Sequence, residues 1–299
     1  MGTTSESVQF EGALGNSLDG ELELPEEKTR TFAIFAHCFT GSKDLFPSIH
    51  ISRRLAERGI GVLRFDFTGL GQSGGDFSGT TFSSTVGDVV AAEQYLTEHR
   101  REATLLVGHS FGGTAAIAAA RQLPQVEAVA TIGAPYDPAH VEHLFSEKVD
   151  EIKQGGEATV TIQGRSFQIR KAFLEDIRER EMAPHLEGLD RPMLLFHAAT
   201  DEVVGLSNAE KIYEAAKHPK SLMSLGDTDH LLTNREDIEY IASILEEWAE
   251  RNLSIPNVRP PDPRPIASVT TRKCSTPRTR PRSSQALSAS SPIGTVPQG

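Results

Sequence analysis

Cysteine is scarce in this chain. Its 299 residues contain two cysteines, Cys38 and Cys274, which lie far apart in different sequence contexts. Such a pair argues against a disulfide framework and favours a reducing compartment, so we expect a cytoplasmic protein. With so few cysteines and no spaced cluster of histidine, cysteine and carboxylate residues, the sequence predicts no metal site.

Long apolar runs are also lacking. No stretch of eighteen apolar residues occurs, and the first twelve residues have neither the basic start nor the apolar core of a secretory signal. The formal net charge is −11, although residues 252–299 hold seven Lys or Arg and only one Asp. Residues 1–251 are therefore more acidic than the whole chain, and neither nucleic acid nor an anionic membrane is an expected partner.

Cofactor motifs are lacking as well. The segment Asp66-x-x-Gly69-x-Gly71 superficially resembles a phosphate loop, but it has no following Lys-Ser/Thr pair. It also lacks the third glycine of a dinucleotide-binding turn. We interpret this segment as a tight turn with a structural Asp66, and we expect no cofactor.

What the chain does contain is a regular alternation of strands and helices. Two short strands, 7–12 and 18–24, come first, and apolar runs of strand length follow at 32–37, 60–65, 105–107, 126–132, 193–197 and 221–225. Helical spacing occurs at 46–58, 81–100 (with Ser83 or Ser84 as possible caps), 207–217 and 235–251. Apolar strands separated by helices predict a mostly parallel sheet with right-handed crossovers.

Two segments break this alternation. Residues 137–184 contain a predicted helix at 138–154, a β-hairpin at 157–170 and a helix at 173–180, and we expect them to form a small lid. Residues 252–299 are rich in Pro, Ser and Arg and have no hydrophobic period, so we expect a disordered tail after a domain at 1–251.

The most informative stretch is TLLVGHSFGGTAAIAAA at residues 104–120, a short strand, a sharp turn with one serine, and a helix. In a turn this tight, side chains two residues before or after Ser110 would collide with neighbouring backbone, and both positions are glycine. The turn would place the serine hydroxyl at a helix N-terminus, where backbone N–H groups stabilise developing negative charge. The G-x-S-x-G pattern alone is weak evidence because glycine and serine are common residues.

Partners for a nucleophilic serine follow later in the chain. A serine hydroxyl needs a base that also returns the proton to the leaving group, and a carboxylate that orients this base. Asp201 follows the strand at 193–197, and His230 follows the strand at 221–225. This order of serine, acid and histidine is typical of a sheet that carries such a turn. The competing carboxylates are Glu202, Asp227 and Asp229.

Two backbone N–H groups are needed to hold the oxyanion. We expect one from Phe111, directly after the serine, and one from Phe39, in the loop after the strand at 32–37. Cys38 has no clear base and is interpreted as a small buried residue. The remaining histidines are assigned to packing, loop shape or the lid: His37, His109, His140, His143 and His197.

With HCFTGSKD, RFDFTGLGQSGGDFSGTTFSS, GHSFGG, HAATDEVV and DTDHLL in place, the chain resembles the α/β-hydrolases over residues 7–250. More narrowly, it is similar to the hydrolase half of bacterial hydrolase–OsmC fusion proteins, near the serine aminopeptidase-like and esterase group. The resemblance implies an eight-stranded sheet, a lid near 137–184, and a cofactor-independent serine mechanism. Nothing after residue 252 resembles an OsmC domain.

We therefore predict a serine hydrolase acting on a small carboxylic ester, with Ser110 as nucleophile, His230 as base and Asp201 as orienting acid. An amide or peptide substrate remains open, because the three residues do not distinguish it. A binding protein that kept the fold without turnover is a further alternative. The oligomeric state and the acyl length are not indicated by the sequence.

Overall fold

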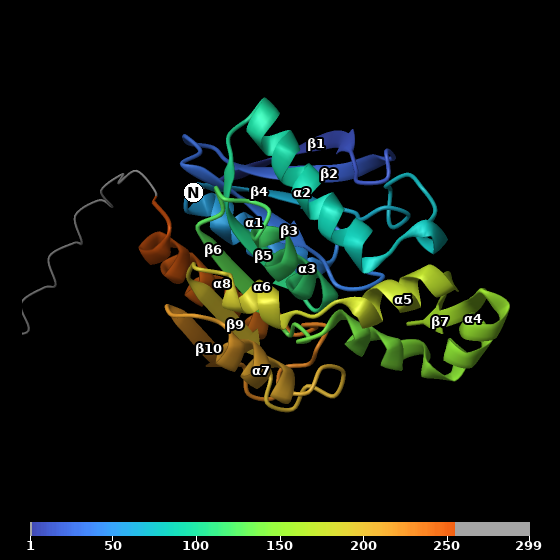
Figure 1. The fold of residues 1–299 in the computed structure, drawn as a ribbon. Coiled ribbons are helices and arrows are strands. Elements are labelled where there is room, and N and C mark those ends of the chain that lie inside the picture. The colour runs from blue at the N-terminus through green and yellow to red at the C-terminus, as the bar shows by residue number, and fades with distance from the viewer. Residues whose placement is uncertain (1, 255–299) are drawn as a thin grey trace, which may run out of the picture. The chain divides into compact units, whose positions relative to one another are not determined.

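The central feature of the fold is an eight-stranded sheet, seen in a computed structural model that describes residues 2–254 (Figure 1). Its order is β1 (Thr3–Glu11), β2 (Ser17–Pro25), β4 (Ile60–Phe65), β3 (Thr31–Ala36), β5 (Ala103–His109), β6 (Ala128–Ile132), β9 (Met193–His197) and β10 (Lys220–Ser224). β1 and β2 pair antiparallel, β2 joins β4 antiparallel, and all other neighbours are parallel. The predicted α/β-hydrolase sheet is confirmed.

Helices cover both faces of this sheet. One hydrophobic cluster packs α1 (Phe46–Glu57) and α8 (Arg235–Asn252) on one face, and a second packs α2 (Phe82–His99), α3 (Phe111–Ala120) and α7 (Ser207–Ala215) on the other. Within β3, Ile34 belongs to one cluster and Phe35 to the other. Because both faces are covered, the parallel strands read as continuous apolar runs rather than as alternating ones.

The start of α2 differs from the prediction. Its N-cap is Thr81 rather than Ser83 or Ser84, and Thr81 Oγ1 accepts from the Ser84 N–H at 3.1 Å. Ser84 Oγ in turn accepts from the Thr81 N–H at 2.9 Å, which completes a capping box. Ser84 is thus the third helical residue, and Ser83 instead binds Asp176 of the insertion.

The insertion consists of η2 (Pro138–Lys148), α4 (Val149–Gly155), the hairpin β7 (Glu157–Ile162) and β8 (Arg165–Arg170), α5 (Lys171–Glu179) and α6 (Ala183–Glu187). The predicted single helix at 138–154 is wrong, because the chain breaks at Phe145 and the first part is a 3-10 helix. Phe145 is buried and its ring lies 6.4 Å from that of Phe173. The hairpin is confirmed, with its turn at Gln163 and Gly164, and α6 was not predicted.

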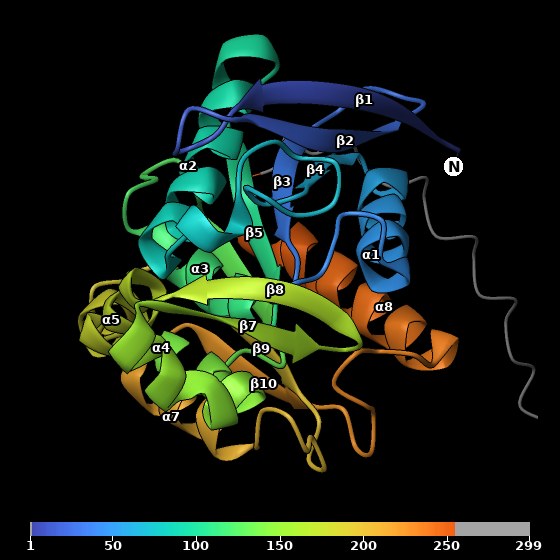
Figure 2. The ribbon, with the colours of Figure 1, turned by 90° about the vertical axis from the view of Figure 1, so that its right-hand side faces the viewer.

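The insertion packs against the loop that follows β3, at the carboxyl end of the parallel strands. Figures 1 and 2 show β7, β8, α4 and α5 grouped together outside the sheet. The Arg165 guanidinium donates to the Thr40 carbonyl at 2.6 Å, and the Phe173 ring lies 5.6 Å from the Phe39 ring. The insertion therefore covers the edge at which we expect the functional residues.

The last described residues follow the final helix. α8 ends at Asn252, and Leu253 is buried against the cluster that contains α1. The rest of the predicted tail lies outside the described residues, so its disorder stays a prediction. Within residues 2–254, no helix combines the length and the hydropathy that crossing a bilayer requires.

Candidate active site

The turn between β5 and α3 places Ser110 in a strained backbone conformation. Ser110 has φ 53° and ψ −125°, a region that favours glycine. A Cβ atom at Gly108 would lie 2.4 Å from the Gly112 carbonyl oxygen, and one at Gly112 would lie 2.3 Å from the His37 carbonyl oxygen. Only glycine fits at these two positions, so the collisions expected from the sequence are confirmed.

The structure brings Ser110, His230 and Asp201 together. The Ser110 hydroxyl lies 2.9 Å from His230 Nε2, and His230 Nδ1 lies 2.7 Å from Asp201 Oδ2. Asp201 lies in the loop after β9 and His230 in the loop after β10, and these two strands are parallel neighbours. Nδ1–H donates to the carboxylate, which leaves Nε2 free to accept the proton of the serine hydroxyl.

The second oxygen of Asp201 is held by the backbone. Asp201 Oδ1 accepts from the N–H groups of Val203 at 2.9 Å and Val204 at 2.8 Å. Burial by itself would raise the pKa of the Asp201 carboxyl, but the His230 hydrogen bond and these two backbone bonds outweigh burial and lower it. Asp201 therefore stays ionised and fixed in orientation beside His230.

The competing carboxylates do not reach His230. Glu202 and Asp227 are exposed. Asp229 accepts from the N–H groups of Leu231 and Thr233, both at 2.9 Å, and so shapes the loop that carries His230. Of the acids considered from the sequence, Asp201 is the one that the structure pairs with the histidine.

The two residues expected to supply oxyanion amides, Phe39 and Phe111, lie near each other. Phe111 is the first residue of α3, and Phe39 lies in the loop after β3; their rings are 5.2 Å apart. Within residues 2–254, neither backbone N–H has a hydrogen-bond acceptor. A free N–H at each position is what a substrate oxygen would require.

The loop that carries Phe39 is anchored by a buried ion pair. Asp66 Oδ1 accepts from the Lys43 backbone N–H at 2.7 Å, and Asp66 Oδ2 lies 3.2 Å from Lys43 Nζ. Asp19 from β2 lies 2.9 Å from the same ammonium group. Burial would lower the pKa of Lys43, but its bonds to Asp19, Asp66 and Asp44 outweigh it and raise the pKa. Asp66 is thus structural, as expected; Lys43 and Asp19 were not singled out from the sequence.

Two histidines donate hydrogen bonds to backbone carbonyls in the loops that carry His230 and Asp201. His109 Nε2 donates to the His230 carbonyl at 2.8 Å, and His140 Nε2 donates to the Val203 carbonyl at 2.9 Å. Burial, followed by the nearby His230, lowers the pKa of His109 to about 4. The assignment of His140 to the lid is therefore incomplete, because its ring also contacts the loop of Asp201. His143 is exposed.

Cys38 is buried beside the expected oxyanion loop. Burial raises the pKa of its thiol to about 11, so the reactive thiolate is disfavoured at neutral pH. The prediction of a small buried residue agrees with this environment. The nearby Arg165 guanidinium would lower the pKa of this thiol, but burial outweighs it.

The fold and the Ser–His–Asp arrangement define a class of protein. The model of a family described as "Alpha/beta hydrolase family" matches residues 33–235. The chain belongs to the alpha/beta hydrolase family.

Particular relatives are similar over most of the chain. A crystal structure of the esterase domain of a Rhodothermus marinus protein is 42% identical, with a TM-score of 0.68, and the match covers 83% of this chain and 98% of that one. "Putative esterase YitV" of Bacillus subtilis (strain 168) is 26% identical over 255 residues, which is 78% of this chain and 94% of the relative. Est1E of Butyrivibrio proteoclasticus, solved with ferulic acid, shares the fold at 19% identity and a TM-score of 0.68, over 82% of this chain and 99% of that one. This chain is a hydrolase similar to esterases.

Proposed function

We propose that the protein is a serine hydrolase that cleaves small carboxylic esters through an acyl-enzyme on Ser110. The observation that carries the proposal is the continuous hydrogen-bonded chain from the Ser110 hydroxyl through His230 to Asp201, at 2.9 and 2.7 Å. The strained turn that presents Ser110 supports it, because such strain persists where function needs it.

The proposed reaction has two acyl transfers. Ser110 Oγ attacks the ester carbonyl carbon while His230 Nε2 takes its proton, and the Phe39 and Phe111 amides hold the oxygen that becomes negative. The bond from carbonyl carbon to alcohol oxygen then breaks, and His230 gives its proton to the departing alcohol. Water repeats the sequence on the acyl-enzyme, which releases the acid and restores Ser110.

An ester is favoured over an amide by the names of the relatives. The Rhodothermus marinus domain and the Bacillus subtilis relative both carry esterase names. The arrangement of Ser110, His230 and Asp201 itself serves either substrate. An ester substrate for this chain is therefore part of the proposal.

A fluorophosphonate probe tests the nucleophile, and short p-nitrophenyl esters test the reaction. Wild-type protein should be labelled covalently and should hydrolyse the esters, whereas Ser110→Ala should do neither. Ser78→Ala, which replaces a buried serine of the 3-10 helix η1 (Phe77–Gly79) before α2, serves as a matched control and should remain labelled. Equal labelling of Ser110→Ala and wild type would assign the nucleophile to another residue. Absence of labelling and turnover in the wild type would favour a binding protein.

A further inference from the structure

Two cavities of very different size are lined by the residues that flank the candidate nucleophile in the chain. Phe111, directly after Ser110, lines a cavity of about 10 Å³, and His109, directly before it, lines a groove of about 480 Å³. Cys38 and Thr40 line both spaces. The small cavity and the large groove therefore meet at the loop that carries the expected oxyanion amide.

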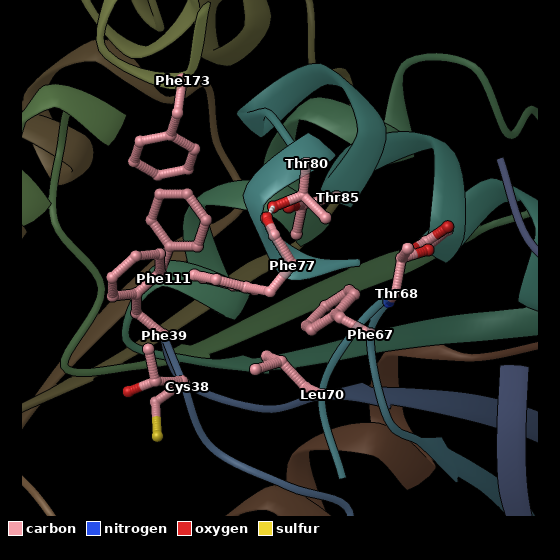
Figure 3. A pocket seen from close by; sticks show the side chains of 12 residues that line it. Cys38, Phe39, Phe67, Thr68, Leu70, Phe77, Thr80, Thr85, Phe111 and Phe173 are labelled. Atoms are coloured by element: carbon pink, nitrogen blue, oxygen red, sulfur yellow. Dashed lines mark hydrogen bonds between the residues drawn. The ribbon is translucent and has the colours of Figure 1, made fainter. Parts of the chain in front are cut away.

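Aromatic side chains close the small cavity. The Phe39 ring lies 5.7 Å from Phe77, 5.2 Å from Phe111 and 5.6 Å from Phe173, and Figure 3 shows these rings gathered in one cluster. Phe173 comes from α5 of the insertion and is buried. A space of about 10 Å³ is at the lower limit for a single water molecule, so without rearrangement it admits no group larger than a methyl.

The large groove is open and has apolar walls. Leu45, Phe46 and Pro47 at the start of α1 form one wall, and Leu231 and Leu232 form another. Among residues 2–254, Phe46 and Leu231 are two of four large hydrophobic side chains that are strongly exposed, at 47% and 41%. Exposed apolar side chains gathered along one groove indicate a binding surface for an apolar group.

The chemistry of the proposed reaction determines which part of an ester lies on which side. His230 must give its proton to the alcohol oxygen, so the alcohol lies on the side of His230. The groove walls Leu231 and Leu232 directly follow His230, whereas the small cavity is lined by the residues of both oxyanion amides, Phe39 and Phe111. The acyl chain extends from the carbonyl carbon away from the leaving alcohol, toward the small cavity.

We propose that this enzyme selects esters of very short acids with large apolar alcohols, with Phe173 limiting the acyl group and Phe46 contacting the alcohol. This specificity rests on the proposed esterase function. The substrate class follows from the unequal sizes of the two spaces and from the groove residues Leu231 and Leu232, which directly follow the proton donor in the chain.

A pair of isomeric esters tests the assignment. Hexyl acetate and ethyl hexanoate contain the same atoms and differ only in which side of the ester carries the long chain. Each substrate methylene that is buried in the groove, rather than left in water, raises kcat/KM by roughly threefold to fourfold. For the wild type, pH-stat titration should therefore give a kcat/KM for hexyl acetate at least about tenfold above that for ethyl hexanoate.

Two variants separate the two sides. Phe173→Ala should raise kcat/KM for ethyl hexanoate about tenfold and leave hexyl acetate nearly unchanged, because it opens only the acyl side. Leu174→Ala, which shortens the neighbouring buried side chain of α5 outside the cavity, should not change the ratio between the isomers. Phe46→Ala should raise KM for hexyl acetate several-fold without affecting ethyl acetate.

Each result has a clear meaning. A wild type that prefers ethyl hexanoate, or treats the isomers alike, would overturn the assignment while leaving the esterase function intact. The same holds if Phe173→Ala and Leu174→Ala shift the ratio equally, since loosening of α5 would then explain the change. Failure of every ester, together with absence of fluorophosphonate labelling, would overturn the proposed function and the assignment with it.

Discussion

Asp201 is held by more than its contact with His230. One oxygen binds the imidazole and the other accepts two backbone N–H groups. An asparagine at this position could still accept at one oxygen, but its amide group could donate toward the imidazole and favour the wrong tautomer. The carboxylate is thus needed for the proton position as much as for its charge.

For this reason we expect Asp201→Asn to lower kcat by roughly 10³–10⁴-fold with little change in stability. Steady-state hydrolysis of p-nitrophenyl acetate measures the loss, and urea unfolding measures the stability. Glu202→Gln is the matched control, because Glu202 is adjacent to Asp201 and exposed. An Asp201→Asn variant within tenfold of the wild type would show that the base is oriented by another group.

Individual residues differed in how far the sequence could predict them. Ser110, Asp201 and His230 each follow an apolar strand, so their meeting at one sheet edge follows from local pattern plus parallel topology. The bonds from His109 to the His230 carbonyl and from Lys43 to Asp19 join segments far apart in the chain. Neither contact leaves a periodic signal, so neither could be predicted.

At the scale of elements, the contact between β3 and α3 is unusually close. A Cβ atom at Gly112 would meet the carbonyl oxygens of His37 at 2.3 Å and Ala36 at 2.4 Å. Both contacts are with backbone, which cannot swing aside as a flexible side chain can. Any side chain at this position would push α3 away from the strand.

We therefore expect Gly112→Ala to destabilise the protein by about 1–3 kcal/mol and to reduce fluorophosphonate labelling of Ser110, because α3 carries the Phe111 amide. Chemical unfolding and the rate of labelling are the measurements. Gly79→Ala is the control, since no atom lies within 4 Å of the added Cβ. Equal effects of the two substitutions would show that the close approach relaxes without consequence.

Elements were predictable where their pattern is local. The strands buried on both faces and the hairpin of the insertion appear directly as apolar or alternating runs. The break at Phe145 has no signal in the spacing of residues 138–154, whereas its buried ring lies near Phe173 of α5, which is distant in the chain. The N-cap of α2 was misplaced because Thr81 and Ser84 each accept from the other's backbone N–H, and threonine and serine are both common N-cap residues.

At the scale of the whole molecule, several buried histidines couple folding to pH. Burial is the main cause that lowers the pKa values of His37, His109 and His197 below 6.5, and that of His109 falls to about 4. Between pH 6.5 and about 4, the unfolded chain binds protons that the folded protein does not. The free energy of unfolding therefore falls as the pH drops through this range. Asp201, with a lowered pKa, loses its contribution only below the unfolded value of about 3.9.

We expect the free energy of unfolding to fall between pH 7 and pH 5, and to fall less steeply in His109→Phe. Each histidine that titrates only in the unfolded state contributes a slope of about 1.4 kcal/mol per pH unit. Urea unfolding at several pH values measures the two slopes. Parallel slopes would mean that His109 binds its proton equally in the folded and unfolded states.

The positive φ of Ser110 means that the side chain required for the proposed activity lowers the stability of the folded protein. Glycine adopts φ 53° without strain, whereas serine and alanine do not. Ser110→Gly should therefore be about 1 kcal/mol more stable than Ser110→Ala in thermal or urea unfolding, although both are inactive. If the two unfold alike, the turn stores no strain. If they differ as expected, the serine that the proposed reaction requires makes the folded protein less stable than glycine would at the same position.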